Sequence, residues 1–413
     1  MKKKLIKRDI LDEILDYIDD DQILVLHGAR QVGKTNLLYL IQDFLQKRGN
    51  KTFFFDLEDI SIVDVLDAGV ETVLDHLKKT VGSMDQFKEN GKRLYVFIDE
   101  IQYLKNPSPL LKLLVDHHKY LKLVVSGSSS FDIKRKFTNS LVGRTFEFEV
   151  FNLSFREFLR FKESPYNVEN FSIGSNAGPA FADMLRLYRE YALFGGYPKV
   201  VLEDIIKKKQ EILRQIINTY VRKDIRDLAG IRDIRKFNNL LKLLASQSGQ
   251  MLSVNGLADV LEINRKTAEE YLFILENTYI IKLVYPFSHS AKVEVVKAPK
   301  IFFYDTGLLQ MLWKRGLEEN MVGNIFETSV FAELVKKHGR EDIHYWRTRS
   351  QTEVDFVLDL RTGVLPVEVK TNFRNFKSNA VSSFCKKYKA KDYKVVGLEG
   401  DKRDEHCIYP WEL

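Results

Sequence analysis

The chain has 413 residues, more than one hydrophobic core usually serves, so we expect two to four domains. The two cysteines, Cys385 and Cys407, have no metal-ligand spacing around them, which excludes a disulfide scaffold and a zinc site. No signal peptide and no bilayer-length apolar run is recognisable, so we expect a cytoplasmic protein without a membrane partner. The net charge of +7 fits either a polyanionic partner such as nucleic acid or a lysine-rich solvated surface.

Strands and helices are expected to alternate over the first 152 residues. Apolar runs of strand length are followed by stretches of helical length, which implies right-handed crossovers and a parallel sheet. We therefore predict an α/β core domain over residues 1–152. Its expected strands are 23–27, 52–56, 94–99, 121–125 and 144–150, and its expected helices are 34–47, 60–79 and 110–120.

Three further domains are expected after this core. Residues 153–232 are mostly helical and are predicted to form a lid. Residues 233–300 are predicted to form a winged helix-turn-helix, because three helices precede two strands. Residues 301–413 are predicted to form a second α/β domain. In the winged part we expect helices at 236–246, at 254–261 behind the cap Ser253 and at 265–277 behind the cap Asn264, with strands at 279–284 and 293–296; in the last part we expect helices from 323 and at 378–388, with strands at 344–346, 354–358, 364–370 and 393–397.

A glycine-rich loop joins the first expected strand to the first expected helix. Its spacing, G-x-x-x-x-G-K-T, is that of a Walker A motif, and this motif requires a strand before it and a helix after it. Backbone N–H groups of such a loop surround phosphates, the lysine supplies a cation, and the threonine hydroxyl binds magnesium. The sequence therefore predicts an ATP and Mg²⁺ site formed by Gly28, Ala29, Arg30, Gln31, Val32, Gly33, Lys34, Thr35 and Asn36.

Further polar residues follow the later strands of the expected core. Asp99 is expected to hold the magnesium shell, and Glu100 to polarise the attacking water. After the fourth strand, either Ser128 or one of the next two serines, Ser129 and Ser130, senses the γ-phosphate, or these serines form a hydroxyl-rich turn. Arg144 precedes the fifth strand and is interpreted either as an arginine finger shared between subunits of a homo-oligomer or as a surface arginine.

These motifs occur together with others in a fixed order. Over nearly its whole length the chain resembles a family of uncharacterised bacterial and archaeal AAA-type ATPases. The resemblance implies an AAA-type P-loop ATPase core with a helical lid, a winged helix and a restriction-nuclease-like α/β domain, and it implies no substrate. The segments that carry it are 28–35, 98–102, 126–130, 143–144, 151–158, 195–198 and 297–307.

A second candidate site lies within residues 301–413. Asp355 is on one expected strand, and Glu368 and Lys370 share a face of the next, because side chains alternate along a strand. The pattern resembles the PD-(D/E)xK nuclease core, in which carboxylates bind Mg²⁺ or Mn²⁺ and the lysine activates water for attack on a phosphodiester. Glu327, on the preceding helix, is a candidate further metal ligand. Either this site cleaves DNA, or the domain is an inert scaffold.

Basic residues of the expected winged helix favour DNA as the partner, although such modules also bind proteins. Arg265 and Lys266 begin its third helix, and Lys292 and Lys297 flank its wing. The tract 386–394 interleaves lysines with aromatic residues and either lines a nucleic-acid path or is a solvated helix end. Our leading hypothesis is an AAA-type ATPase that acts on DNA as a remodeller or as an ATP-coupled nuclease. The alternative is a nucleotide-dependent switch that binds a protein partner.

Overall fold

The chain folds into two compact units. The computed structural model describes residues 5–88, 92–127, 141–168, 178–220, 231, 233–288, 298–402 and 404–413. Contacts within the chain separate Met1–Phe151 from Asn152–Leu413. The boundary lies one residue from the expected end of the core domain, while the expected divisions at residues 232 and 300 stay predictions.

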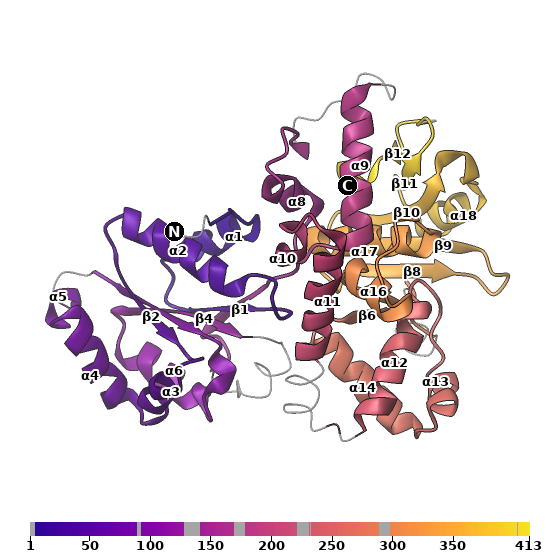
Figure 1. Ribbon diagram of the computed structural model, residues 1–413. Helices are drawn as coiled ribbons and strands as arrows, with labels where there is room; N and C mark the ends of the chain where they lie inside the picture. The colour runs from indigo at the N-terminus through magenta and orange to yellow at the C-terminus, as the bar shows by residue number, and fades with distance from the viewer. Residues whose placement is uncertain are drawn as a thin grey trace. The chain divides into compact units, whose positions relative to one another are not determined.

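A five-stranded parallel sheet forms the centre of the first unit, in the order β2-β3-β4-β1-β5. Its strands are β1 (Ile23–His27), β2 (Lys51–Asp56), β3 (Leu94–Asp99), β4 (Leu121–Gly127) and β5 (Thr145–Glu149), and its helices are α1 (Ile10–Asp16), α2 (Lys34–Lys47), α3 (Ile60–Asp67), α4 (Val70–Val81), α5 (Asp85–Lys88), η1 (Ile101–Tyr103) and α6 (Pro107–His117). The mainly apolar strands β1, β3 and β4 are buried along their whole length. Figure 1 shows the reason: α1 and α2 cover one face of the sheet, and α3, α4 and α6 cover the other.

The α/β core with a parallel sheet is therefore confirmed, but one expected helix is wrong. Instead of a single helix over 60–79, the chain forms α3 and α4, separated at Ala68 and Gly69. Gly69 has a φ of +110°, a conformation that residues with side chains rarely adopt. The expected helix at 110–120 begins earlier, at Pro107, because proline is favoured in the first turn of a helix.

Helices make up the first half of the second unit. They are α8 (Phe155–Phe161), α9 (Pro179–Phe194), α10 (Pro198–Val201), α11 (Ile206–Tyr220), α12 (Ile234–Ser246), α13 (Val254–Leu261) and α14 (Arg265–Asn277). The three helices expected in the winged part are confirmed, with Ser253 and Asn264 accepting hydrogen bonds as N-caps, and Figure 1 shows them grouped together. The strands β6 (Ile281–Val284) and β7 (Lys300–Phe303) pair antiparallel, whereas the strand expected at 293–296 lies outside the described residues. No helix in the described ranges is long and apolar enough to cross a bilayer.

A mixed five-stranded sheet, in the order β12-β11-β10-β9-β8, forms the rest of the second unit. Its strands are β8 (Ile343–Arg347), β9 (Glu353–Leu360), β10 (Gly363–Asn372), β11 (Lys394–Glu399) and β12 (Cys407–Ile408), accompanied by α16 (Thr306–Trp313), α17 (Gly323–His338), η5 (Phe373–Asn375), α18 (Asn379–Tyr388) and η6 (Pro410–Glu412). β10 pairs antiparallel with β9 and parallel with β11. The expected strands and helices are present, and the likeness to a restriction nuclease stays a prediction.

Candidate functional sites

The loop between β1 and α2 follows a path that requires glycine. Gly33 has a φ of +99° and is the residue before α2. A Cβ atom at Gly28 would lie 2.0 Å from the carbonyl oxygen of Val150, so a side chain there would displace the segment after β5. The N-terminus of α2 has no capping side chain. Its first N–H groups therefore suit an anion such as a phosphate.

Lys34 and Thr35 begin α2, and each contacts a defined partner. Lys34 Nζ donates to the carbonyl oxygens of Gly28 at 3.0 Å and Ala29 at 2.8 Å. Thr35 Oγ1 donates to Asp99 Oδ2 at 2.6 Å. The lysine cation thus lies against the loop, and a hydroxyl and a carboxylate oxygen lie side by side. Oxygens of this kind are the ligands that Mg²⁺ prefers, together with nucleotide phosphates.

The other residues of the predicted nucleotide site differ in solvent exposure. Ala29 and Val32 are buried, Arg30 and Gln31 are half-buried, and Asn36 is exposed on α2.

Arg8 is a buried residue of this site that sequence reasoning missed. Its guanidinium donates to the carbonyl oxygen of Val32 at 2.8 Å and to that of Phe151 at 2.9 Å. No local pattern could have identified it, because its partners lie 24 and 143 positions away.

Asp99 and Glu100 lie at the end of β3 and have different partners. The two Asp99 carboxylate oxygens accept hydrogen bonds from the hydroxyls of Ser126 and Thr35. Burial raises the pKa of Asp99, against the effect of these two donors. Glu100 has a φ of +57°, and its carboxylate accepts a hydrogen bond from Gln102 Nε2. The side chains of Ser126 and Gln102 thus orient the acidic pair.

Ser126 is the second residue that sequence reasoning missed. The expected sensor, Ser128, lies outside the described residues. Ser126, at the end of β4, contacts Asp99, and its Oγ also accepts from the backbone N–H of Glu100 at 3.2 Å. The position of Ser126 at the end of a strand was a usable signal. β3 and β4 are parallel neighbours, and the ends of parallel neighbours meet at one edge of the sheet.

Arg144 forms a two-point ion pair within its own chain. Its Nε lies 2.9 Å from Asp116 Oδ1, and its Nη2 lies 3.0 Å from Asp116 Oδ2. The hydrogen bonds from Arg144 lower the pKa of Asp116. An arginine finger acting across a subunit boundary would have to exchange this partner, so that role stays a prediction.

The structure brings Asp355, Glu368 and Lys370 together on the neighbouring strands β9 and β10. Lys370 Nζ lies 2.7 Å from Glu368 Oε2 and 3.0 Å from Asp355 Oδ2. The other carboxylate oxygen of Glu368 is buried and has no hydrogen-bond partner among the described residues. Burial and the neighbouring Asp355 raise the pKa of Glu368 to about 8. Burial alone would lower the pKa of Lys370, but the two carboxylates raise it.

A second ion-pair group adjoins this cluster. Lys300 of β7 is buried, and its Nζ lies 2.5 Å from Glu353 Oε1 and 3.5 Å from Glu327 Oε1. Burial raises the pKa of Glu327 to about 7, an effect that Lys300 opposes and that Asp355 reinforces. Glu353 could have been expected here, because it is two positions before Asp355 and so shares its face. Lys300 could not, because the motif of residues 297–307 that contains it does not show which carboxylates it faces.

Neither the phosphate-binding loop nor the carboxylate–lysine clusters of the second unit form a complete metal site from the described protein side chains alone. In the described part of the chain, no three His, Cys, Asp or Glu side chains form a group that could hold a metal ion. At the phosphate loop this is compatible with magnesium, which keeps several waters and binds through one or two carboxylates plus phosphates. In the second unit, lysines lie between the carboxylates, but the unpartnered oxygen of Glu368 is a buried acceptor that suits a cation.

Comparison with known families identifies the first unit. Residues 20–159 match a family described as an AAA domain. These residues form an AAA-type P-loop domain. A solved Walker-type ATPase of Pyrococcus abyssi shares the fold with a TM-score of 0.50 and 16% identity, over 76% of this chain and 97% of its own.

The rest of the chain matches families without an assigned activity. Residues 185–319 and 322–412 match two families, each described as a domain of unknown function (DUF8612 and DUF4143). An uncharacterised protein of Haemophilus influenzae is 27% identical over 89% of this chain and 88% of its own length. One from Methanocaldococcus jannaschii is 28% identical over 86% of this chain and 76% of its own. These matches support an uncharacterised AAA-type ATPase family.

The basic residues expected to meet DNA lie in a mixed-charge setting. Arg265 Nε donates to Glu269 Oε1 at 2.8 Å, one turn along α14. Lys266, Glu269 and Glu270 are all exposed on this helix. Lys292 and Lys297 lie outside the described residues. The described part of α14 therefore does not present a uniformly positive surface.

The tract 386–394 is divided between a helix end and β11. Lys387 Nζ lies 5.9 Å from the ring centroid of Trp346 and 5.0 Å from that of Tyr388. This lysine therefore already interacts with aromatic rings of its own domain.

Three of the sequence motifs meet in a buried polar network in the second unit. Asp305 is the N-cap of α16 and accepts from Leu308 N at 2.9 Å. Its other oxygen accepts from Asn152 Nδ2 at 2.5 Å and from Gly196 N at 2.9 Å. A Cβ atom at Gly195 would lie 2.3 Å from Asp305 Oδ1. The absence of a side chain at Gly195 therefore leaves room for this carboxylate.

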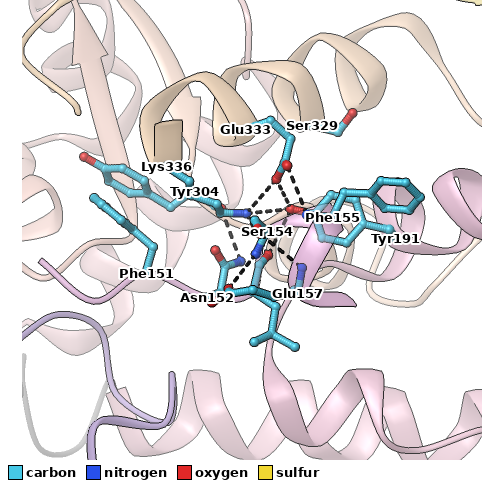
Figure 2. A network of polar contacts seen from close by, with 12 residues as sticks. Phe151, Asn152, Ser154, Phe155, Glu157, Tyr191, Tyr304, Ser329, Glu333 and Lys336 are labelled. Carbon is cyan, nitrogen blue, oxygen red and sulfur yellow. Dashed lines mark hydrogen bonds and ion pairs between the residues drawn. The ribbon is translucent and has the colours of Figure 1, made fainter. Parts of the chain in front are cut away.

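The network continues from α9 to α17, as Figure 2 shows. Tyr191 donates to the carbonyl oxygen of Leu153 at 3.0 Å and to Glu333. Lys336 Nζ donates to the same carbonyl at 2.9 Å and to the Tyr191 hydroxyl at 2.6 Å. Glu333 also accepts from Phe155 N at 3.0 Å. The first residues of the second unit are thus bound to its later helices.

Proposed function

We propose that this chain hydrolyses ATP, acts on DNA, and carries a metal-dependent phosphodiester-cleaving site in its second unit. The observation that carries the ATPase part is the arrangement of Lys34, Thr35, Asp99 and Glu100 around one phosphate-binding loop. The AAA-domain match over residues 20–159 supports it.

Each of these residues has a distinct role in the proposed hydrolysis. ATP with Mg²⁺ supplies the phosphoryl group and the bridging charge. Lys34 and the loop N–H groups bind the phosphates, while Thr35 and Asp99 hold the metal shell. Glu100 orients and polarises the attacking water, and Gln102 fixes the direction of its carboxylate. In a homo-oligomer, Arg144 would leave Asp116 and stabilise the charge that develops on the neighbouring subunit's nucleotide.

Asp355, Glu368 and Lys370 form the proposed cleavage site. A bound Mg²⁺ or Mn²⁺ supplies Lewis-acid chemistry there. The unpartnered oxygen of Glu368 and the carboxylate of Asp355 would hold it together with water, and Lys370 would orient the attacking water. Glu327 would become a further ligand only by leaving Lys300. The resemblance to a nuclease core and the net charge of +7 support DNA as the substrate.

A second candidate function is a nucleotide-dependent switch that binds a protein partner. The pairing of Arg265 with Glu269, and the exposure of Glu270 beside them, favour it. Exposed carboxylates on a recognition helix repel phosphates, whereas a mixed-charge surface suits a protein.

The two candidates separate in one set of assays. ATP turnover and DNA cleavage are measured with single-stranded, duplex and branched DNA for the wild type, Lys34→Ala and Glu368→Ala. Lys34→Ala is expected to abolish turnover, whereas Lys47→Ala, which removes an exposed lysine paired with Asp43 on the same helix, is expected to leave it unchanged. Glu368→Ala is expected to abolish manganese-dependent cleavage but to retain turnover. Turnover that no DNA stimulates would leave the protein switch as the better candidate.

A further inference from the structure

We infer that Arg8 is a positioning residue that couples the phosphate loop to the end of the first unit. The inference rests on the proposed ATP hydrolysis. Arg8 is only 5% exposed, and its guanidinium donates to one carbonyl in the loop, that of Val32, and to one at the unit's last residue, Phe151. A charged group buried in this way is destabilised when one of its hydrogen bonds is lost.

The bond to Val32 also sets the direction of a phosphate-binding group. A trans peptide is planar, so its carbonyl and the following N–H point in opposite directions. Fixing the carbonyl of Val32 therefore fixes the N–H of Gly33 on the opposite side of the backbone. Gly33 immediately precedes α2 and has a φ of +99°, so its peptide plane is not held by an ordinary helical conformation. Arg8 supplies that restraint.

The loop contacts the same terminal segment at its other end. Val150 N donates to the carbonyl oxygen of His27 at 2.7 Å. The carbonyl oxygen of Val150 lies against Gly28, with no room for a side chain between them. Residues 150–151 are thus fastened to the beginning of the loop by backbone contact and to its end by Arg8.

This double attachment gives nucleotide binding a route to the second unit. A change in the peptide plane between Val32 and Gly33 is passed to Phe151 through Arg8. The next residue, Asn152, begins the second unit and is bound to Asp305. Loss of Arg8 should therefore weaken both phosphate binding and the response of residues 150–153 to nucleotide.

The test compares Arg8→Met and Arg8→Lys with Lys7→Met in the full chain. Lys7 is the neighbouring cation, exposed and paired with Asp12 at 2.7 Å, and its loss should change nothing. Arg8→Met is expected to raise the KM for ATP about tenfold or more with kcat changed far less, because a charged hydrogen-bond donor to the loop is lost. In Arg8→Lys the lysine reaches one carbonyl at a time, so its KM is expected to lie between those of Lys7→Met and Arg8→Met. This variant serves as the test if Arg8→Met does not fold.

Hydrogen exchange provides the second measurement. A non-hydrolysable ATP analogue is expected to slow amide exchange at residues 150–153 in the wild type and in Lys7→Met, but not in the Arg8 variants. Folded Arg8 variants with unchanged KM and unchanged exchange protection would overturn the inference. A wild type without ATP turnover would instead refute the proposed function. In that case, the effect of the analogue on amide exchange at residues 150–153 would still test the role of Arg8.

Discussion

Replacing Asp305 by alanine is expected to destabilise the second unit by about 3 kcal/mol, because three donors would lose their acceptor. Leu308 N would lose its N-cap, which typically contributes about 1 kcal/mol. The N–H of Gly196 and the amide of Asn152 would be left unsatisfied in a buried setting, at about 1–3 kcal/mol each. Burial raises the pKa of Asp305, so removing this carboxylate also relieves a desolvation cost, which places the net loss near the lower end of the sum.

Tryptophan fluorescence measures this loss selectively. Trp313, Trp346 and Trp411 are the three tryptophans of the chain, and all belong to the second unit. A loss of about 3 kcal/mol should lower the unfolding temperature of that unit by roughly 6–12 °C. Binding of a fluorescent ATP analogue by the first unit should persist.

Asp233→Ala is the matched control. Asp233 is an exposed N-cap in the same unit, and among the described residues its carboxylate accepts only from Lys236 N, at 3.0 Å. Its replacement should cost about 1 kcal/mol. Equal losses for the two variants would show that Asp305 acts as a cap alone and that the argument from the buried network is mistaken.

Three further substitutions test other parts of the structure. In urea unfolding, Glu368→Gln should be about 1–3 kcal/mol more stable than the wild type at pH 9 but not at pH 5. The pKa of Glu368 in the folded protein, about 8, exceeds its value in the unfolded chain, so the wild type loses stability as the pH rises towards 8. Lys122→Met should destabilise the first unit by about 2–4 kcal/mol in circular dichroism melts, because buried Lys122 donates to three backbone carbonyls within residues 17–22. Gly28→Ala should weaken binding of a fluorescent ATP analogue at least about tenfold, because its Cβ would collide with Val150; unchanged affinity would contradict the loop geometry.

Local sequence patterns predicted the elements whose cause is local. The caps Ser253 and Asn264 and the helix of residues 265–277 follow from side-chain bonds to the next turn. The glycine spacing of residues 28–35 likewise predicts the loop conformation from neighbouring residues alone. The break at Gly69 was missed because an amphipathic pattern continues across it, and only the backbone conformation reveals the turn.

Residues that reach a site from far away in the sequence were not predictable in this way. Arg8 lies outside every motif and Lys300 lies in a motif that does not show its contacts, and each is defined by partners on other elements. The bonds of Asp305 to Asn152 and Gly196 depend on three separated segments meeting. Such roles follow from tertiary packing, which spacing in one sequence does not encode.

The hydrogen bond from Lys336 to Leu153 can form only late in synthesis of the chain. The two residues are 183 positions apart, so at about 5–20 residues per second a ribosome needs roughly 10–40 s to make the second after the first. During that interval the first unit is already complete, whereas Tyr191 and the helices around it lack Glu333 and Lys336. The nascent chain therefore carries a finished nucleotide-binding unit beside helices that still await their partners, and those helices are where a chaperone would be expected to act.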